Sequence, residues 1–396
     1  MKDKNNRLAA GQLLYDAALI IFLFQGIFRN TLLVLTAQTS VYLTVIQCLY
    51  LISMALLAVK AVFFDDIFHS PLMRSIPFWI FSILLAVSTV ISRNPAVFSV
   101  WMFAAAYKNI RFEKEVRTAF ITELIVVGAI ILLSAVGILP TAVLDPEGVY
   151  HPMNRYSLGF LHPNSLGLYL FHIVCCFVYL RRNKSLLPSF LVVIAVSIFN
   201  YFVPSSRTPV LSSVLLLICI SLNRLLSKGN IKNADRKKKI FSGVLIAGTV
   251  CAMAGSFMIS FFYDLPVMQK IDTFFSGRFS SISRIIASNQ ITWFGRAPFS
   301  VGGAFDNSYM WILLHYGILI YLSVSILMVC LMVRLSQEKR YEEMIFLFIY
   351  SFYAMMETEL FVANKCIFVL LFGLLLFDEK AAATTRETSE TTEKTE

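Results

Sequence analysis

Apolar residues fill the chain in long blocks, and most polar residues fall in the short stretches between them. A window of about 18 to 20 mostly apolar residues is long enough to cross the hydrocarbon core of a bilayer as an α-helix. The pattern predicts about twelve such helices, of which the fourth and the eleventh are short. They are Leu13–Phe28, Ser40–Val59, Ile76–Ile91, Pro95–Tyr107, Thr118–Leu139, Ser165–Leu180, Leu186–Val203, Pro209–Leu222, Ile240–Phe262, Tyr309–Val333, Met344–Met356 and Val362–Phe377.

Three other segments complete the predicted organisation. Two connections, 140–164 and 263–307, exceed the length of a turn, and long loops in a compact protein usually carry function. The second one contains Phe279, Ile282, Ile285 and Ile286 at helical spacing, which predicts an amphipathic helix at the membrane interface. We therefore expect one transmembrane domain over residues 1–377, followed by a disordered Thr/Glu-rich tail at 378–396.

Composition supports a polytopic, all-α membrane protein. The chain has 396 residues, of which 58% are hydrophobic and only 15% are charged, and a soluble domain cannot bury that much apolar surface. The formal net charge of +10 does not indicate a nucleic-acid partner, because the basic residues lie in short clusters between the apolar blocks.

The distribution of these basic residues predicts the orientation, because cytoplasmic loops collect Lys and Arg. With twelve helices and a cytoplasmic N-terminus, the outer segments contain nine of the 34 Lys and Arg residues, and the inner segments contain the other 25. Both termini are then cytoplasmic, and the two long loops, 140–164 and 263–307, are extracytoplasmic.

Three arginines on the predicted outer face oppose this rule: Arg155 in the first long loop, Arg207 in the short connection "PSSRTP", and Arg278 in the second long loop. A guanidinium group offers paired, permanently charged donors that match a phosphate or diphosphate. Each arginine alone is also explained by contact with lipid phosphates. Three of them on one face favour a binding site for an anion.

A few other ionisable residues are candidates for chemistry on the same face. His162 precedes Pro163 and Asn164 at the start of the sixth predicted helix, where a histidine can act as a general base near neutral pH. The alternative is that Asn164 caps this helix and His162 is incidental. Glu357 lies near the outer end of an apolar helix, where an ionisable group is costly and therefore a functional candidate.

The remaining candidates are less specific. His315 follows Asp306 by nine residues on the tenth predicted helix, and either lines a cavity or packs in the core. His172 lies deeper in its helix and is expected to pack in the bundle. Acidic residues on the outer face show no spacing typical of metal ligands, so we expect neither a metal nor a cofactor.

Four short stretches of the chain resemble a known family. The stretches "RYSLGFLHPNSLG", "PSSRTP", "SGRF" and "FDNSYMWILLHYG" occur in this order between Arg155 and Gly317, and together they resemble the Wzy-type polysaccharide polymerases, which belong with the O-antigen ligases. Members of this family are metal-independent, inverting glycosyltransferases of the C type. They act at the outer face of the bacterial cytoplasmic membrane and transfer a glycan from undecaprenyl diphosphate onto the next lipid-linked repeat unit of a capsule, exopolysaccharide or O-antigen.

The resemblance implies roles for individual residues. The three outer arginines would hold the diphosphate, and the "HPN" stretch would lie beside the substrate. His162 is the first candidate for the base that deprotonates the acceptor hydroxyl, and Glu357 and Asp306 are the reserves. The expected site residues are therefore His162, Arg207, Arg278 and Glu357 for catalysis, and Arg155, Asn164, Asp306, Asn307, Tyr309 and His315 for substrate binding.

The resemblance also implies partners. Three other functions stay open: an O-antigen-ligase-like enzyme, a flippase or other transporter, and a purely structural membrane scaffold, which explains none of the outer arginines. Expected partners are undecaprenyl-diphosphate-linked oligosaccharides and membrane lipid, with a chain-length regulator and other capsule-assembly proteins as candidates. An O-antigen-ligase-like enzyme would carry a histidine in the second long loop, which has none. A flippase or other transporter would place ionisable residues at mid-bilayer, and Asp16 in the first predicted helix fits that pattern.

Overall fold

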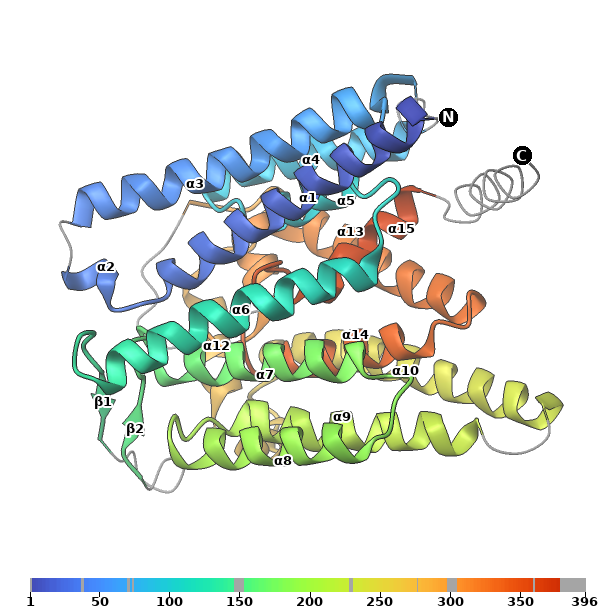
Figure 1. The fold of residues 1–396 in the computed structure, drawn as a ribbon. Coiled ribbons are helices and arrows are strands. Elements are labelled where there is room, and N and C mark those ends of the chain that lie inside the picture. The colour runs from blue at the N-terminus through green and yellow to red at the C-terminus, as the bar shows by residue number, and fades with distance from the viewer. Residues whose placement is uncertain are drawn as a thin grey trace.

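The described part of the chain is a bundle of long helices that run between two ends of the molecule (Figure 1). The computed structural model describes residues 2–36, 39–69, 72, 75–145, 153–227, 231–275, 277–297, 305–358 and 360–377. The expected disordered tail at 378–396 lies outside these residues. The elements in chain order are α1 (Lys2–Arg29), α2 (Leu33–Thr36), α3 (Thr39–Val59), η1 (Lys60–Phe64), η2 (Ile67–His69), α4 (Ile76–Ser92), α5 (Ala96–Ala105), α6 (Phe112–Ala135), β1 (Val143–Leu144), β2 (Arg155–Tyr156), α7 (Pro163–Leu180), α8 (Leu187–Phe202), α9 (Arg207–Leu226), α10 (Ile231–Phe261), α11 (Pro266–Phe274), α12 (Arg278–Ser288), α13 (Ser308–Gln337), α14 (Tyr341–Tyr353), η4 (Ile367–Phe372) and α15 (Gly373–Leu376).

Seven of the described helices are long and apolar enough to cross a membrane, which agrees with a multi-pass, helical membrane protein. They lie within α1, the α3–η1 pair, α6, α7, α9, α10 and α13. Four shorter apolar helices coincide with further predicted spans: α4, α5, α8 and the segment Ile367–Leu376. The total of twelve crossing helices stays a prediction. Large apolar side chains such as Ile83, Val90, Ile125 and Leu132 are exposed on the helices, as expected where a helix faces lipid.

The loops gather at one end of the bundle. The hairpin of β1 and β2, together with α2, lies at one end, whereas the start of α1 and the short α15 lie at the other (Figure 1). The hairpin pairs Leu144 with Arg155 in antiparallel register, and a second bridge joins Thr31 to Phe160. The first long loop therefore contains a small sheet that holds Arg155 in place.

The predicted amphipathic helix in the second long loop is present as α12. Phe279 and Ile282 belong to the protein core and Ile285 is buried beside them, whereas Arg284 is exposed and donates within its own helix, to Ser280 at 3.4 Å and to Ser281 at 3.3 Å. The apolar face of α12 thus packs on the bundle and fixes the position of its first residue, Arg278.

Helix α13 is broken one third of the way along its length. Gly317 has φ 85° and ψ 174°, a conformation that favours glycine because it lacks a Cβ. The carbonyl oxygen of His315, which the break releases, accepts from the backbone N–H of Arg296 at 3.1 Å. Gly295 lies so close that a Cβ atom there would meet this oxygen at 2.0 Å. The loop before α13 therefore satisfies the broken helix by backbone contact, which is how irregular backbone is tolerated at membrane depth.

The last predicted helix, Val362–Phe377, departs most from the sequence-based expectation. The chain is irregular from Leu360 to Cys366, and forms the 3-10 helix η4 and the short α15 only after that. Ile367 to Leu371 are completely buried. The backbone N–H of Ile367 donates to Nε2 of His172 at 3.0 Å, and Nδ1 of this ring lies 2.8 Å from Glu123. The segment is therefore buried in the centre of the bundle and is not one regular helix over Val362–Phe377.

Candidate functional site

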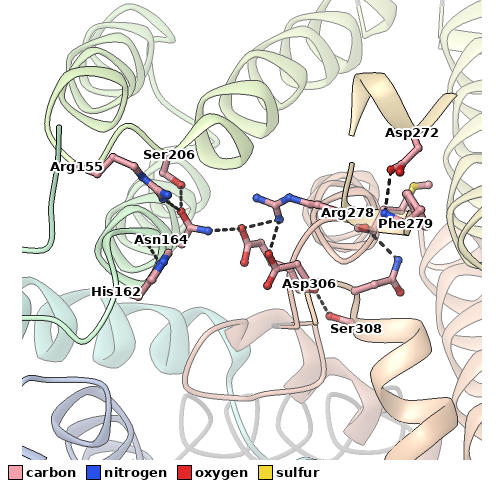
Figure 2. Close-up of polar contacts among 12 residues, drawn as sticks. Arg155, His162, Asn164, Ser206, Asp272, Arg278, Phe279, Asp306 and Ser308 are labelled. Atoms are coloured by element: carbon pink, nitrogen blue, oxygen red, sulfur yellow. Dashed lines mark hydrogen bonds and ion pairs between the residues drawn. The ribbon is translucent and has the colours of Figure 1, made fainter. Parts of the chain in front are cut away.

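Three helices begin together at the loop end of the bundle, and each beginning carries a polar residue (Figure 2). Nδ1 of His162 accepts the backbone N–H of Asn164 at 3.1 Å and caps α7. Asn307 caps α13 by accepting from Met310 at 3.0 Å. Asp272 accepts from the first turn of α12 through both of its carboxylate oxygens, at 2.9 and 3.0 Å. These caps fix three helix starts, whose dipoles all favour negative charge at this end.

Arg155 is held on one side of this site. Its residue is 4% exposed, its Nε donates to the carbonyl of Pro204 at 3.2 Å, and its Nη2 donates to Oδ1 of Asn164. The hydroxyl of Ser206, just before α9, donates to the same oxygen at 3.4 Å. A permanent cation is therefore buried between the hairpin and the starts of α7 and α9.

Glu357 links this group to the second long loop. Its Oε1 accepts from Nδ2 of Asn164 at 3.2 Å and from Nη1 of Arg278 at 3.0 Å. Nη1 of Arg278 also lies 3.6 Å from Oδ2 of Asp306. The result is a continuous polar path in which a buried carboxylate connects two arginines through one amide (Figure 2). Residues separated by about 200 positions in the sequence thus meet at one site.

The two carboxyl groups on this path stabilise the positive charge of Arg278. Burial alone lowers the pKa of the Arg278 guanidinium, but the negative charges of Glu357 and Asp306 outweigh burial and raise it. Arg278 therefore stays protonated under all ordinary conditions. Only 8% of the Glu357 side chain is exposed, so its attraction to the guanidinium is poorly screened by water.

Ser308 positions Glu357, and the sequence patterns did not single it out. Its hydroxyl donates to the backbone carbonyl of Glu357 at 2.6 Å and accepts from the backbone N–H of Leu360 at 3.1 Å. One side chain at the start of α13 therefore fixes the irregular chain that carries the carboxylate. In the sequence, the position of Ser308 directly after "FDN" was the signal that could have indicated a role at the site.

The other sequence-predicted residues lie around this path. Arg207 is the first residue of α9, directly after Ser206, and its side chain is exposed. Asn307 is fully buried and also donates to the carbonyl of Met355 at 3.0 Å, so it supports the chain below the site.

Two further predicted residues point elsewhere. Tyr309 is buried and its hydroxyl donates to the carbonyl of Ser351 at 2.9 Å. His315 lies two turns along α13, where its Nδ1 is 3.2 Å from the carbonyl of Trp311 and its ring packs on the indole. These contacts lie outside the path between Arg155 and Asp306.

No protein-family model, curated protein or solved structure matches the chain. Among the residues that the structure describes, there is no group of three or more His, Cys, Asp and Glu arranged to hold a metal ion. The candidate site is therefore defined by its own geometry: two arginines, a buried carboxylate, an amide and three helix starts at one end of an apolar bundle.

Proposed function

We propose that the protein is a polysaccharide polymerase, a metal-independent and inverting glycosyltransferase that uses undecaprenyl-diphosphate-linked glycans at the outer face of the bacterial cytoplasmic membrane. The observation that carries the proposal is the path from Arg155 through Asn164 and Glu357 to Arg278. A diphosphate on a lipid requires fixed cations at the edge of an apolar bundle, and this path supplies them beside a carboxylate. The loop end of the bundle would face outward, with both termini cytoplasmic.

The proposed reaction is a single displacement. An acceptor sugar hydroxyl of one lipid-linked repeat unit attacks the anomeric carbon of the donor glycan. The bond from that carbon to the diphosphate oxygen breaks, a new glycosidic bond forms with inversion, and the hydroxyl proton passes to a base. Arg155, Arg207 and Arg278 stabilise the negative charge that develops on the departing lipid diphosphate.

The geometry favours Glu357 over His162 as the base. Nδ1 of His162 accepts a backbone N–H, so the neutral ring carries its proton on Nε2 and is a donor on that side. A base must accept a proton, and Glu357 offers a carboxyl group 3.0 Å from the permanent cation of Arg278. In this mechanism His162 orients the start of α7 and donates to a substrate oxygen, and Asp306 supports Arg278.

The decisive test uses purified protein in proteoliposomes with lipid-linked repeat units. We expect polymer to form in EDTA, and Glu357→Gln to lower the rate about 10²- to 10⁴-fold, the range of general base catalysis. The matched control is Asp264→Asn, which removes an exposed carboxylate from the second long loop. An absence of polymer, or activity that is abolished by EDTA and restored by magnesium, would refute the proposal.

One observation favours a second candidate, a flippase for lipid-linked oligosaccharides. Glu123 and His172 are both completely buried within helices predicted to cross the membrane, and such groups often mark a transport pathway. Deleting the gene separates the two functions. Single lipid-linked repeats that still reach the outer face without long polymer indicate a polymerase, whereas repeats trapped inside indicate a flippase.

A further inference from the structure

A second polar site lies at the opposite end of the bundle from the candidate active site. Helices α7 and α9 begin at the active-site end, so their last turns lie at the other end, where α8 and α14 begin. These four helix ends line a narrow cleft. Arg181, Arg182, Arg224, Asn223 and Glu342 supply its polar lining.

Two of the three arginines in the cleft are engaged in holding the protein together. Nη2 of Arg182 donates to Glu113 at 2.6 Å, and Nη2 of Arg224 donates to the backbone carbonyl of Arg182 at 2.8 Å. Arg181 differs from them. Its guanidinium lies over the ring of Phe177 at 5.6 Å, and its buried Nε has no hydrogen-bond partner in the part of the chain that the structure describes.

Asn223, which also lines the cleft, has an unmatched acceptor. Asn223 is 4% exposed, and its Nδ2 donates to Oε1 of Glu342 at 3.0 Å. Its buried Oδ1 has no partner within the described residues. A buried polar atom without a partner is costly, so the donor of Arg181 and the acceptor of Asn223 are both positions that a ligand group would satisfy.

We propose that this cleft binds the headgroup of an anionic phospholipid that carries a free hydroxyl group. The phosphate accepts from Arg181, and the headgroup hydroxyl donates to Oδ1 of Asn223. Val178 and Ile220 line the same cleft and receive the apolar part of the lipid next to the phosphate. Basic pockets between membrane helices are a common form of lipid site. The proposal does not depend on the reaction at the other end of the bundle.

The test measures the thermal unfolding temperature of the full-length protein in detergent as single lipids are added. We expect phosphatidylglycerol to raise it most, phosphatidylmethanol, which has the phosphate but no hydroxyl, to raise it less, and phosphatidylcholine to raise it least. Arg181→Gln should weaken the response to phosphatidylglycerol about tenfold in lipid concentration. The matched control is Lys184→Gln, which removes an exposed cation from the same connection and should leave the response unchanged.

Several outcomes would overturn the proposal. Equal responses to phosphatidylglycerol and phosphatidylcholine mean that no anion site exists, and an equal loss in Lys184→Gln means that the effect is general surface charge. Binding of glycerol 3-phosphate as tight as that of the lipid means that the cleft takes a soluble phosphate. Should Arg181→Gln fail to fold, Arg181→Lys keeps the charge without the directed Nε donor, and an unchanged lipid response in that variant contradicts the proposed contact.

Discussion

The ion pair between Arg278 and Glu357 allows a quantitative test that needs no substrate. Replacing Arg278 by Met removes the guanidinium that lies 3.0 Å from the Glu357 carboxylate, whose side chain is only 8% exposed. Breaking a fully buried pair costs about 3 to 5 kcal/mol, and the 19% exposure of the Arg278 side chain reduces this to about 2 to 3 kcal/mol. Glu357→Gln keeps the shape and one acceptor oxygen, so we expect it to cost about 1 kcal/mol.

The double variant decides whether the two groups interact. With both charges removed, position 357 no longer carries a carboxylate that needs the cation of Arg278, so the combined loss should fall short of the sum of the single losses by about 1.5 kcal/mol or more. The measurement is the free energy of unfolding in mixed micelles as the fraction of dodecyl sulfate rises, followed by tryptophan fluorescence. Arg284→Met combined with Glu357→Gln is the control, because Arg284 is exposed and should add to Glu357 within about 0.5 kcal/mol. If the losses for Arg278 and Glu357 are also additive, the central contact of the site does not exist.

The remaining predictions concern activity, topology and pH. Arg207→Lys should lower the polymer formed per inserted protein about ten- to a hundred-fold, because lysine lacks the planar guanidinium group. The control Arg284→Lys should have only a small effect on this yield. Wild-type activity in Arg207→Ala would show that Arg207 is not part of the site. A cysteine at the exposed Gln290 should react with a membrane-impermeant thiol reagent in intact cells, and one at Lys237 should not; the reverse pattern inverts the topology. Burial raises the pKa of the Asp65 carboxyl from 3.8 to about 6. The folded protein therefore binds the Asp65 proton more tightly than the unfolded chain does. The stability that this proton contributes is fully present below about pH 4 and is lost as pH rises through about 6. Asp65→Asn should make the free energy of unfolding less dependent on pH across that range.

The sequence could predict most of the helices, because a long apolar run has few other stable forms in a membrane. It could also predict α12, since Phe279, Ile282 and Ile285 repeat at the spacing of a helix. The convergence of Arg155, Asn164 and the second long loop could be anticipated only as far as the topology rule puts them on one face.

The sequence could not predict how these residues connect. Hydropathy does not distinguish a regular helix from the irregular chain between Leu360 and Cys366, because apolar residues dominate both. The role of Ser308 depends on that irregular chain, and serine at a helix start is otherwise an ordinary capping residue. The tautomer of His162 likewise depends on a backbone contact that only the folded α7 provides.

The position of the buried segment from Leu360 to Leu376 has a consequence for biosynthesis. The ribosome makes this segment after every helix that surrounds it, so a nascent chain inserted up to α14 has a bundle with an unfilled centre and lacks the carboxylate of Glu357. At that stage Nε2 of His172 lacks the hydrogen bond that the backbone N–H of Ile367 donates to it in the finished protein. The polar path of the candidate site is therefore complete only after the chain beyond α14 has been made and inserted.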